Sequence, residues 1–391
     1  MSRTNKLFEL PSPSQDIITS LKFNDSSRLL CTSFDGTVTI YDVKQHVHNM
    51  INESNGGDNS DIEKPNDTQV TLNTTILDAT WFLNQNGSDD SIYIGCADGY
   101  IRNLNVRNQL SEIGSRHKLG VCKIKSMNYN GMNLLIAGSW DKSFQIIDPR
   151  NGNGSGAGSG SGTSSEKFTI SNKIFNIDTI NEKLVLSTSD RLINIFDIRN
   201  LSKPLSIREN GFKYQTRSLK CMPNGDGFIQ GSIEGRVSVE YFDQHKNQDS
   251  YAFKCHRISG INDENSVPNS NNNNLDLVGP INSINFHKDF GTLFTGGSDG
   301  HVCIWDYNSR KRIKQYGKLD INLSVMETDH LSLNFTQGFN TSNSGILAVG
   351  YSNDGFKNIA NTNDIKNSQP IVKSKVLIKL MNEKEGLPKK K

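Results

Sequence analysis

Long apolar runs are missing from this chain of 391 residues, of which 34% are hydrophobic. No stretch approaches the roughly 18 consecutive apolar residues that a membrane-spanning helix needs. The first residues, MSRTNKLFELPSPSQ, lack the apolar centre of a secretory signal peptide. We therefore expect a soluble, intracellular protein that has no membrane partner.

Cysteine pairs with the C-x-x-C spacing are also missing, although the chain has six cysteines. Five of them lie within apolar, strand-like runs and the sixth follows one, which predicts buried, reduced thiols; they are Cys31, Cys96, Cys122, Cys221, Cys255 and Cys303. The histidines show no metal-ligand spacing, and the common catalytic motifs do not occur. The sequence predicts no metal, no cofactor and no enzyme.

An excess of charge of either sign is the third absence. The chain has 43 Lys and Arg against 41 Asp and Glu, a formal net charge of +2. This balance points neither to a nucleic acid nor to a membrane surface, so any electrostatic function must come from local clusters. Nucleic acid is not among the partners that we expect.

What the chain has instead is a repeated acidic turn followed by an alternating strand. Six copies occur: TSFDGTVTIYD at 32–42, GCADGYIRNLN at 95–105, GSWDKSFQIID at 138–148, STSDRLINIFD at 187–197, GSIEGRVSVEYFD at 231–243 and GSDGHVCIWD at 297–306. An Asp-Gly pair suits a tight turn, and alternation of apolar and polar residues is typical of a strand. Two further β-rich runs precede each turn, so each unit contains three strands and a variable outer segment.

The spacing of the units predicts the architecture. Three successive turn acids follow at intervals of 43, 49 and 44 residues, close to the roughly 40–45 residues of a WD repeat. Longer intervals contain polar tracts, and we expect flexible insertions at about 46–70, 151–166 and 263–276. A weaker seventh unit follows, with its turn at Asp354-Gly355. The prediction is an all-β, seven-bladed WD-repeat propeller over residues 1–383 and a disordered basic tail over 384–391.

A ring of blades needs a clasp, because its two ends are not covalently joined. We expect NKLFELP, which starts at Asn5, to form the outer strand of the last blade beside KVLIKL at 375–380. The repeats are divergent, because the Gly-His pair of typical WD repeats is largely missing and only the sixth unit ends in Trp-Asp, at Trp305-Asp306.

Cationic or titratable residues gather around the fifth unit. They are Lys213, Tyr214 and Arg217 at its entry, Arg236 after its turn, and Lys254, His256 and Arg257 at its outer edge. One interpretation is solvated charges with apolar stems. The other is an anion site, in which Arg236 and Lys254 hold a phosphate or carboxylate. The spacing alone does not decide between them.

Two turns carry a large aromatic residue where the other units have smaller ones. Phe34 and Trp140 precede the turn acids Asp35 and Asp141. They either pack between blades or form an exposed platform for a peptide, since exposed aromatic residues anchor interfaces. The turn acids themselves recur so regularly that we expect them to be structural rather than catalytic.

Four segments carry a resemblance to a known family. They are SWDKSFQIIDPRN at 139–151, KYQTRSLKCMPNGDGFIQGSIEGRVSVEYFD at 213–243, YAFKCHR at 251–257 and PINSINFHKDFGTLFTGGSDGHVCIWD at 280–306. They resemble the mitotic-checkpoint WD-repeat proteins that are the third of the "budding uninhibited by benzimidazole" proteins, from about Lys6 to Gly355. The Asn-rich insertions suggest a yeast-like member.

This resemblance implies an adaptor of the spindle assembly checkpoint in the nucleus and at the kinetochore. The implied partners are GLEBS motifs of a checkpoint kinase and a Mad-class protein, and phosphorylated Met-Glu-Leu-Thr motifs of the kinetochore scaffold. Residue by residue, the implied GLEBS contacts are Phe34, Trp140 and Arg217, and the implied phosphothreonine contacts are Arg236 and Lys254. In the family the position of Phe34 is usually Trp, so its contact is smaller here.

Two other functions are considered beside this one. The related messenger-RNA-export propeller of the nuclear pore shares a segment like FKCHR and also binds GLEBS motifs, so an export adaptor is the alternative. A hydrolase that uses the turn acids is the remotest of the three.

Overall fold

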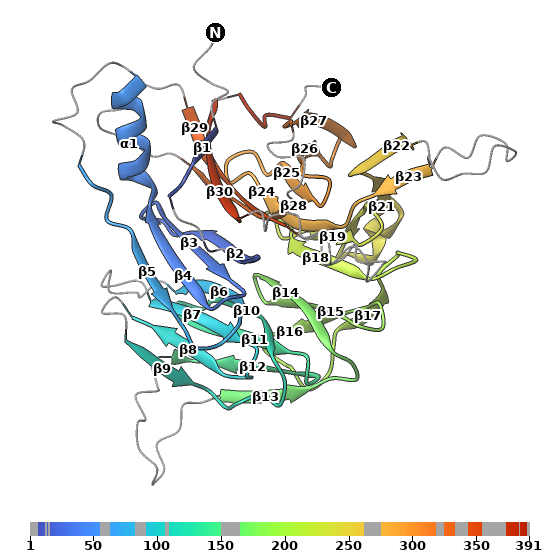
Figure 1. The fold of residues 1–391 in the computed structure, drawn as a ribbon. Helices are drawn as coiled ribbons and strands as arrows, with labels where there is room; N and C mark the ends of the chain where they lie inside the picture. Colours follow the sequence, from blue (N-terminus) through green and yellow to red (C-terminus); the bar gives the residue numbers. More distant parts are fainter. Residues whose placement is uncertain are drawn as a thin grey trace, which may run out of the picture.

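Seven four-stranded antiparallel sheets are arranged radially around a central axis in the computed structural model (Figure 1). The structure describes residues 7–11, 14, 16–54, 63–82, 91–105, 109–149, 165–261, 275–317, 324–332, 343–353, 373–382 and 384–388. This architecture is the predicted seven-bladed propeller.

The first four blades follow the chain in order, with their strands running from the axis outward. Blade 1 consists of β2 (Ile18–Phe23), β3 (Arg28–Ser33), β4 (Thr37–Asp42) and β5 (Thr68–Thr71). Blade 2 consists of β6 (Ile76–Phe82), β7 (Ser91–Cys96), β8 (Ile101–Leu104) and β9 (Leu110–Ile113). Blade 3 consists of β10 (Val121–Tyr129), β11 (Met132–Ser139), β12 (Ser143–Ile147) and β13 (Ser165–Thr169). Blade 4 consists of β14 (Ile174–Ile180), β15 (Lys183–Thr188), β16 (Leu192–Asp197) and β17 (Ser206–Glu209).

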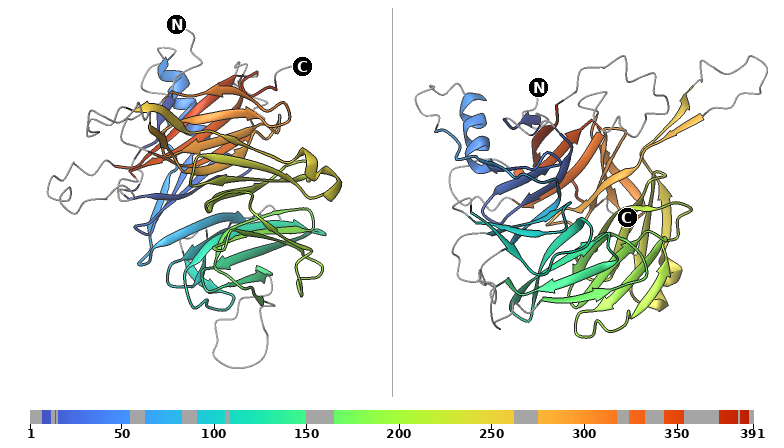
Figure 2. Two further views of the ribbon diagram at one scale, coloured as in Figure 1. Left: turned by 90° about the vertical axis from the view of Figure 1, so that its right-hand side faces the viewer. Right: turned by 60° about the horizontal axis from the view of Figure 1, so that its bottom comes forward.

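The remaining blades include one insertion and the ring closure. Blade 5 consists of β18 (Thr216–Cys221), β19 (Gly227–Ser232), β20 (Arg236–Tyr241) and β21 (Tyr251–Lys254), with the 3₁₀ helix η4 (Gln244–Asp249) before β21. A two-stranded ribbon, β22 (Arg257–Ile261) and β23 (Leu275–Val278), projects from the disc next (Figure 2). Blade 6 consists of β24 (Ile281–Phe286), β25 (Leu293–Gly297), β26 (Val302–Asp306) and β27 (Lys311–Gln315). Blade 7 combines β28 (Ser324–Ser332), β29 (Asn343–Ser352), β30 (Lys375–Asn382) and β1 (Leu7–Glu9).

The ring is closed by the N-terminal strand, as predicted. Strand β1 pairs antiparallel with β30, so that Phe8 lies opposite Ile378. Leu10 extends this pairing with a hydrogen bond of 2.8 Å from its amide to the carbonyl of Val376, and its side chain is buried. Residues 7–10 therefore complete the last blade.

Apolar side chains pack between neighbouring blades rather than in one central core. In one such cluster, Val38 of blade 1 packs with Ile76 and Ile94 of blade 2. The inner and middle strands are buried on both faces, while outer strands such as β13 and β17 alternate between half-buried and exposed residues. The core is therefore a ring of apolar layers, and the axis is left to other side chains.

Every inner strand carries a register shift at the same place. In β2, Ile18 pairs with Ser33 and Ser20 with Thr32, which leaves Thr19 as the extra residue of a β-bulge. Shifts at the equivalent position occur in β6, β10, β14, β18, β24 and β28. The extra residues form one ring around the axis: Thr19, Leu77, Cys122, Phe175, Arg217, Asn282 and Met326.

The expectation of a flexible insertion at about 46–70 is corrected by a helix, α1 (Val43–Ser54). Its apolar residues follow helical spacing, because Val43 and Val47 are buried and Met50 and Ile51 are partly buried against the blade 1 and blade 7 cluster. Strand β5 begins at Thr68, near the other end of the segment, and residues 55–62 lie outside the described part. The many polar residues of this segment suggested a loop, although its apolar residues have the spacing of an amphipathic helix.

The expected disordered tail over 384–391 is also corrected, because residues 384–388 pack on blades 6 and 7. The buried carboxylate of Glu385 accepts bonds from Lys314 Nζ at 2.5 Å and Lys379 Nζ at 2.9 Å. The carbonyl of Gly386 accepts a bond of 2.9 Å from the hydroxyl of Thr292. The boundary of the folded body therefore lies beyond residue 383, and residues 389–391 are outside the described part.

Several other expectations fall wholly or mostly outside the described residues. Most of the expected insertions at 151–166 and 263–276 is not described, although β13 begins at Ser165 and β23 at Leu275. The turn at Asp354-Gly355 also lies outside.

The six cysteines are buried and free, as predicted, and burial raises the pKa of the Cys31 thiol to about 12. Among the described helices, none has the length and apolar character to cross a membrane.

Candidate functional site

The channel mouth is the first candidate site, and its rim is built from the turns between the second and third strands of the blades. The amide of Phe34 donates to the carbonyl of Ile17 at 3.0 Å, and that of Trp140 to Gly120 at 3.1 Å. Ile233 makes the same bond to Gln215 at 3.2 Å. These bonds hold the residue before each turn acid beside the start of an inner strand, which is where the channel opens.

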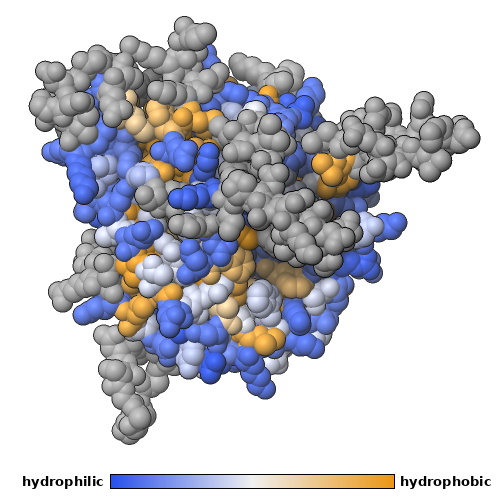
Figure 3. Space-filling model, viewed as in Figure 1, coloured by the Kyte–Doolittle hydropathy of each residue, from blue (hydrophilic) through white to orange (hydrophobic). Residues whose placement is uncertain are grey.

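Phe34, Trp140 and Arg217 line one cavity of about 370 Å³ on the axis, so the structure brings these three predicted residues together. Ile233 lines the same cavity and is 41% exposed, a residue that the sequence comparison of turns did not single out as a site. Patches of apolar surface lie around the centre of the face seen in Figure 3, set among polar surface. The mouth therefore combines apolar groups with Arg217, and four lysines also line the cavity.

The structure shows how far the two aromatic residues are packed and how far they are exposed. Phe34 is 36% exposed. Trp140 is half-buried against the apolar cluster of blades 3 and 4, and a Cβ atom added to Gly120 would lie 3.1 Å from its ring. Trp140 is thus a packed residue with one accessible side, which limits its motion and makes it a rigid contact surface.

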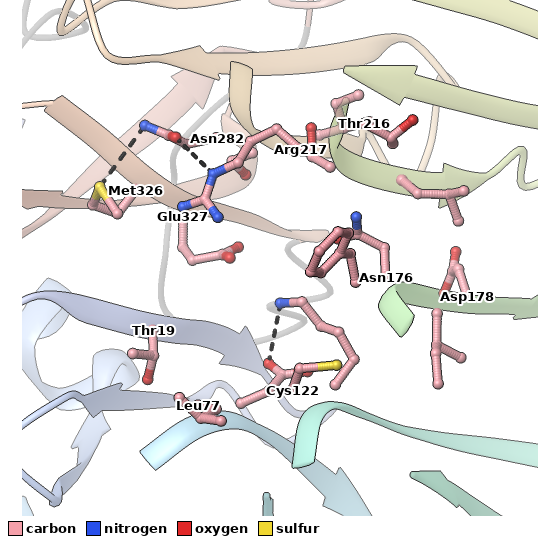
Figure 4. Close-up of a pocket in the computed structure, with 18 of the residues that line it drawn as sticks. Thr19, Leu77, Cys122, Asn176, Asp178, Thr216, Arg217, Asn282, Met326 and Glu327 are labelled. Carbon is pink, nitrogen blue, oxygen red and sulfur yellow. Dashed lines mark hydrogen bonds and ion pairs between the residues drawn. The ribbon is translucent and has the colours of Figure 1, made fainter. Parts of the chain in front are cut away.

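Arg217 is the one charged member of the ring of bulge residues. Its Nε donates to Oδ1 of Asn282 at 3.2 Å, and Asn282 is itself buried and donates to the carbonyl of Val325 at 2.9 Å (Figure 4). Asn282 therefore orients the guanidinium toward the cavity from the neighbouring inner strand. A search for charged residues at equivalent bulge positions would have isolated Arg217.

Further charges lie around the cavity below Arg217. Lys22 and Lys123 share the buried Asp78, at 3.3 and 3.7 Å from its Oδ1. Burial opposes ionisation of Asp78, but the two lysines and an amide bond from Ile124 hold the pKa of its carboxyl below the usual range. Glu327 also lines the cavity, and burial raises the pKa of its carboxyl. These four residues and Arg217 carry a net charge of +1 when all are ionised.

Three further charged residues, Lys125, Asp178 and Lys220, also line the cavity, and with Asp329 close to Lys220 their charges balance. Lys125 pairs with Asp178 at 2.8 Å. Burial disfavours the charge on Asp178, but Lys125 and Lys220 hold the pKa of its carboxyl low. Repulsion from Lys125, with burial, lowers the pKa of Lys220 to about 8. With Asp329, which accepts a 2.7 Å bond from the amide of Phe23, this group has two acids and two lysines.

The cationic corner, formed by Arg236 and Lys254 on the outer part of blade 5, is the second candidate site. The two residues are direct partners in the register of β20 and β21, so their side chains leave the same face of the sheet. Lys254 is exposed, and Nε of Arg236 is a buried donor with no hydrogen-bond partner among the described residues. Neither residue lines the axial cavity.

The turn beside the corner is fixed by Arg257. Its Nη2 donates to the carbonyl of Glu234 at 2.8 Å, and a Cβ atom added to Gly235, whose φ is +64°, would lie 2.7 Å from the carbonyl of Cys255. The carboxylate of Glu234 lies 3.8 Å from Nε of Arg236. Arg236, Lys254, Arg257 and Glu234 together carry a net charge of +2, in an arrangement suited to a doubly charged anion.

His256 does not belong to this cluster, contrary to the expectation. It is buried, with Nδ1 2.8 Å from Asp299 Oδ1 and Nε2 2.9 Å from the hydroxyl of Thr295, which also accepts a bond from Nε1 of Trp305. Burial disfavours the charge on Asp299, but the bond from His256 holds the pKa of its carboxyl low. His256 thus takes the place of the histidine of the Gly-His pair in typical WD repeats, in a buried hydrogen-bond network with Asp299, Thr295 and Trp305. In this sequence the histidine stands in KCHR and does not follow a glycine.

The remaining predicted cations and acids are structural or solvent-exposed. Lys213 and Tyr214 are exposed residues between β17 and β18, outside the cavity lining. The turn acids cap their own turns; Asp35, for example, accepts a 2.9 Å bond from the amide of Thr37. No group of three or more potential metal ligands occurs among the described residues.

The seven four-stranded blades and the buried pair of His256 and Asp299 define a WD-repeat propeller. The model of the WD domain, G-beta repeat, matches residues 4–42 and 274–306. The Arabidopsis thaliana mitotic checkpoint protein BUB3.1 is 33% identical over 81% of this chain and 82% of its own length. The spindle assembly checkpoint protein bub3 of Schizosaccharomyces pombe is 36% identical over 59% of this chain and 65% of its own.

A more distant likeness links the chain to export factors. The mRNA export factor GLE2 of Chaetomium thermophilum is 26% identical over 79% of this chain and 76% of its own. The chain belongs to the Bub3 family of mitotic checkpoint proteins, whose members are non-enzymatic adaptor propellers.

Proposed function

We propose that this protein recruits the spindle assembly checkpoint to unattached kinetochores by holding two different peptides at two separate places. The channel mouth binds GLEBS motifs of the checkpoint kinase and the Mad-class partner through Phe34, Trp140 and Arg217. The cationic corner, Arg236 and Lys254, binds phosphorylated Met-Glu-Leu-Thr motifs of the kinetochore scaffold. The site of action is the nucleus and the kinetochore.

The observation that carries this proposal is the cross-strand pairing of Arg236 with Lys254 away from the channel. A phosphothreonine carries about −1.5 to −2 charges and three acceptor oxygens near neutral pH. The planar guanidinium of Arg236 can donate two parallel bonds to it, while Lys254 adds a point charge. An unphosphorylated threonine offers neither the charge nor the oxygens.

The channel mouth suits a different ligand. Its half-buried aromatic surface favours apolar side chains, and Arg217, oriented by Asn282, favours one acidic side chain. Because the two sites share no residue, one protein can hold a GLEBS motif and a phosphopeptide together. Such simultaneous binding is what an adaptor between kinase and scaffold requires.

Calorimetry with paired peptides tests the proposal. A Met-Glu-Leu-Thr peptide of the scaffold is titrated into the full chain in its phosphorylated and plain forms, with and without a saturating GLEBS peptide. We expect binding of the phosphorylated form alone, with an affinity that the GLEBS peptide leaves unchanged. Equal affinity for the two forms would refute the phosphate site, and competition between the peptides would refute two separate sites.

An export adaptor is the alternative, because the chain is also similar to the export factor GLE2 over most of its length. Capture of partners from mitotic cells separates the two functions. Recovery of the checkpoint kinase supports the proposal, whereas recovery of nuclear-pore components and salt-sensitive RNA binding supports the alternative.

A further inference from the structure

Glu327 occupies an unusual position at the channel mouth. It follows the bulge residue Met326 in β28 and lines the axial cavity, where its half-buried side chain points toward the same space as Arg217 (Figure 4). The carboxylate of Asp78 is shared by two lysines, but no ion pair of the described residues reaches the carboxylate of Glu327. A half-buried acid thus stands unpaired beside the cation that is proposed to bind an acidic partner.

The charges around Glu327 come from four other inner strands. Lys22, Asp78, Lys123 and Arg217, on β2, β6, β10 and β18, all act on its carboxyl group, and β24 faces it with the neutral Asn282. Without Glu327 these neighbours would carry +2, and with it they carry +1. Glu327 therefore sets the charge that the mouth presents to an incoming side chain.

We propose that Glu327 is a specificity-determining residue, which restricts the channel mouth to a singly charged acidic side chain and excludes a phosphorylated one. The inference rests on the proposed binding of an acidic side chain by Arg217. A carboxylate brings one negative charge and neutralises the mouth. A phosphate brings up to two and leaves an excess of negative charge next to Glu327, where water screens charges less than at the surface.

This restriction would direct each of the two proposed peptides to its own site. The cationic corner has a net charge of +2 and suits a phosphate dianion, whereas Glu327 and the four charged residues that act on it carry +1. If this group also carried +2, phosphorylated scaffold peptides could occupy the mouth and displace the GLEBS motif. Glu327 thus separates two anionic ligands by their charge.

The test uses three versions of one GLEBS peptide, with glutamate, glutamine or phosphoserine at the acidic position that reaches Arg217. Every protein carries Arg236→Ala, so that capture of the phosphate by the cationic corner is strongly weakened. Calorimetry gives the affinities of three proteins: Arg236→Ala alone, Arg236→Ala with Glu327→Gln, and Arg236→Ala with Glu327→Asp. The last variant keeps the negative charge. Glu112→Gln is the matched control, because that residue is exposed and lies on the outer strand of blade 2. Thermal melting shows that each variant is folded.

With Glu327 present, we expect glutamate to be preferred over phosphoserine by about tenfold, and Glu327→Asp and Glu112→Gln to keep this ratio. Glu327→Gln should bind the phosphoserine peptide at least as well as the glutamate peptide. An unchanged ratio in a folded Glu327→Gln protein overturns the inference while the role of Arg217 stands. Equal affinity for the glutamate and glutamine peptides in the Arg236→Ala background overturns both.

Discussion

The channel mouth and the cationic corner, the two proposed peptide sites, are built in opposite ways. The mouth is a half-buried cavity to which all seven blades contribute, with aromatic side chains at its rim. Glu327 and the four charged residues that act on it carry a net charge of +1. The corner is formed by one pair of neighbouring residues on the outer strands of one blade, is more open, and has a net charge of +2. In the proposed function, the first site uses both shape and charge, whereas the second relies on charge.

This difference follows from where each site lies in the repeat. The mouth uses a position that every blade has, the bulge and its facing turn. Its proposed contacts, Arg217 and Trp140, stand at two of these positions. The corner uses the register of one hairpin, which places Arg236 opposite Lys254 without help from other blades. Changes at the two sites should therefore act independently.

The largest expected effect is at the corner. Arg236→Ala removes one of two charge-assisted contacts to the phosphothreonine, each of which contributes about 1.5–3 kcal/mol. We expect a loss of roughly tenfold to a hundredfold in affinity for the phosphorylated Met-Glu-Leu-Thr peptide, measured by calorimetry against the plain peptide. Arg236→Lys should recover only part of it, since the fork of donors is gone.

The control for this change is Arg199→Ala, which removes an exposed arginine on blade 4 that pairs with Asp197. It should leave the preference for phosphate unchanged, and the affinity for the GLEBS peptide should stay constant in both variants. An Arg236→Ala protein that still discriminates fully between the two peptides would place the phosphate site elsewhere.

A smaller effect is expected at the mouth. Trp140→Ala removes an aromatic contact whose truncation commonly costs about 2 kcal/mol in an interface, which corresponds to roughly thirtyfold in affinity. Binding of the GLEBS peptide should weaken by this factor while the phosphopeptide affinity is unchanged. Because Trp140 also packs on Gly120, the folded fraction is measured by circular dichroism. A loss of binding that merely follows unfolding would leave Trp140 as a packing residue alone.

The sequence predicted the repeat well, because the acidic turn is local. An Asp-Gly pair and the strand after it are specified by adjacent residues, and the six clear copies lead directly to the blades. The partners within each mouth contact are not adjacent. Asn282 reaches Arg217 only after blade 6 packs on blade 5, and Glu327 reaches the same cavity from blade 7.

Other features carried a signal that the sequence analysis did not use. Val43, Val47, Met50 and Ile51 have the spacing of an amphipathic helix, yet the polar residues around them suggested a flexible insertion. His256 was expected among surface cations. Its buried hydrogen bond is to Asp299, 43 positions further along the chain, and a local reading of the sequence does not show that pairing. In the first case the composition outweighed the spacing of the apolar residues. In the second, the local sequence gave no sign of the distant partner.

The smallest effect on the two affinities is expected from Glu385→Gln, which tests whether the sites respond to stability in general. Glu385 holds Lys314 and the buried Lys379 together at the junction of blades 6 and 7, far from either site in the sequence. Breaking a buried pair typically costs about 3–5 kcal/mol of unfolding free energy, so the midpoint of urea unfolding should fall. Both peptides should still bind with unchanged affinity at 25 °C while the ring stays closed.

The pH dependence of this loss identifies its cause. Burial disfavours the charged carboxyl of Glu385, but the bonds from Lys314 and Lys379 prevail and its pKa is lowered from 4.5. A lowered pKa contributes stability that is fully present above the unfolded-state value and is lost as the pH falls through the folded-state value. The stability difference between the wild type and Glu385→Gln should therefore be constant from about pH 8 to pH 6 and shrink below about pH 4.5. Glu112→Gln, with its exposed pair to Arg102, should show almost no difference at any pH. A difference for Glu385→Gln that does not change with pH would mean that shape, rather than charge, makes the tail pack on the ring.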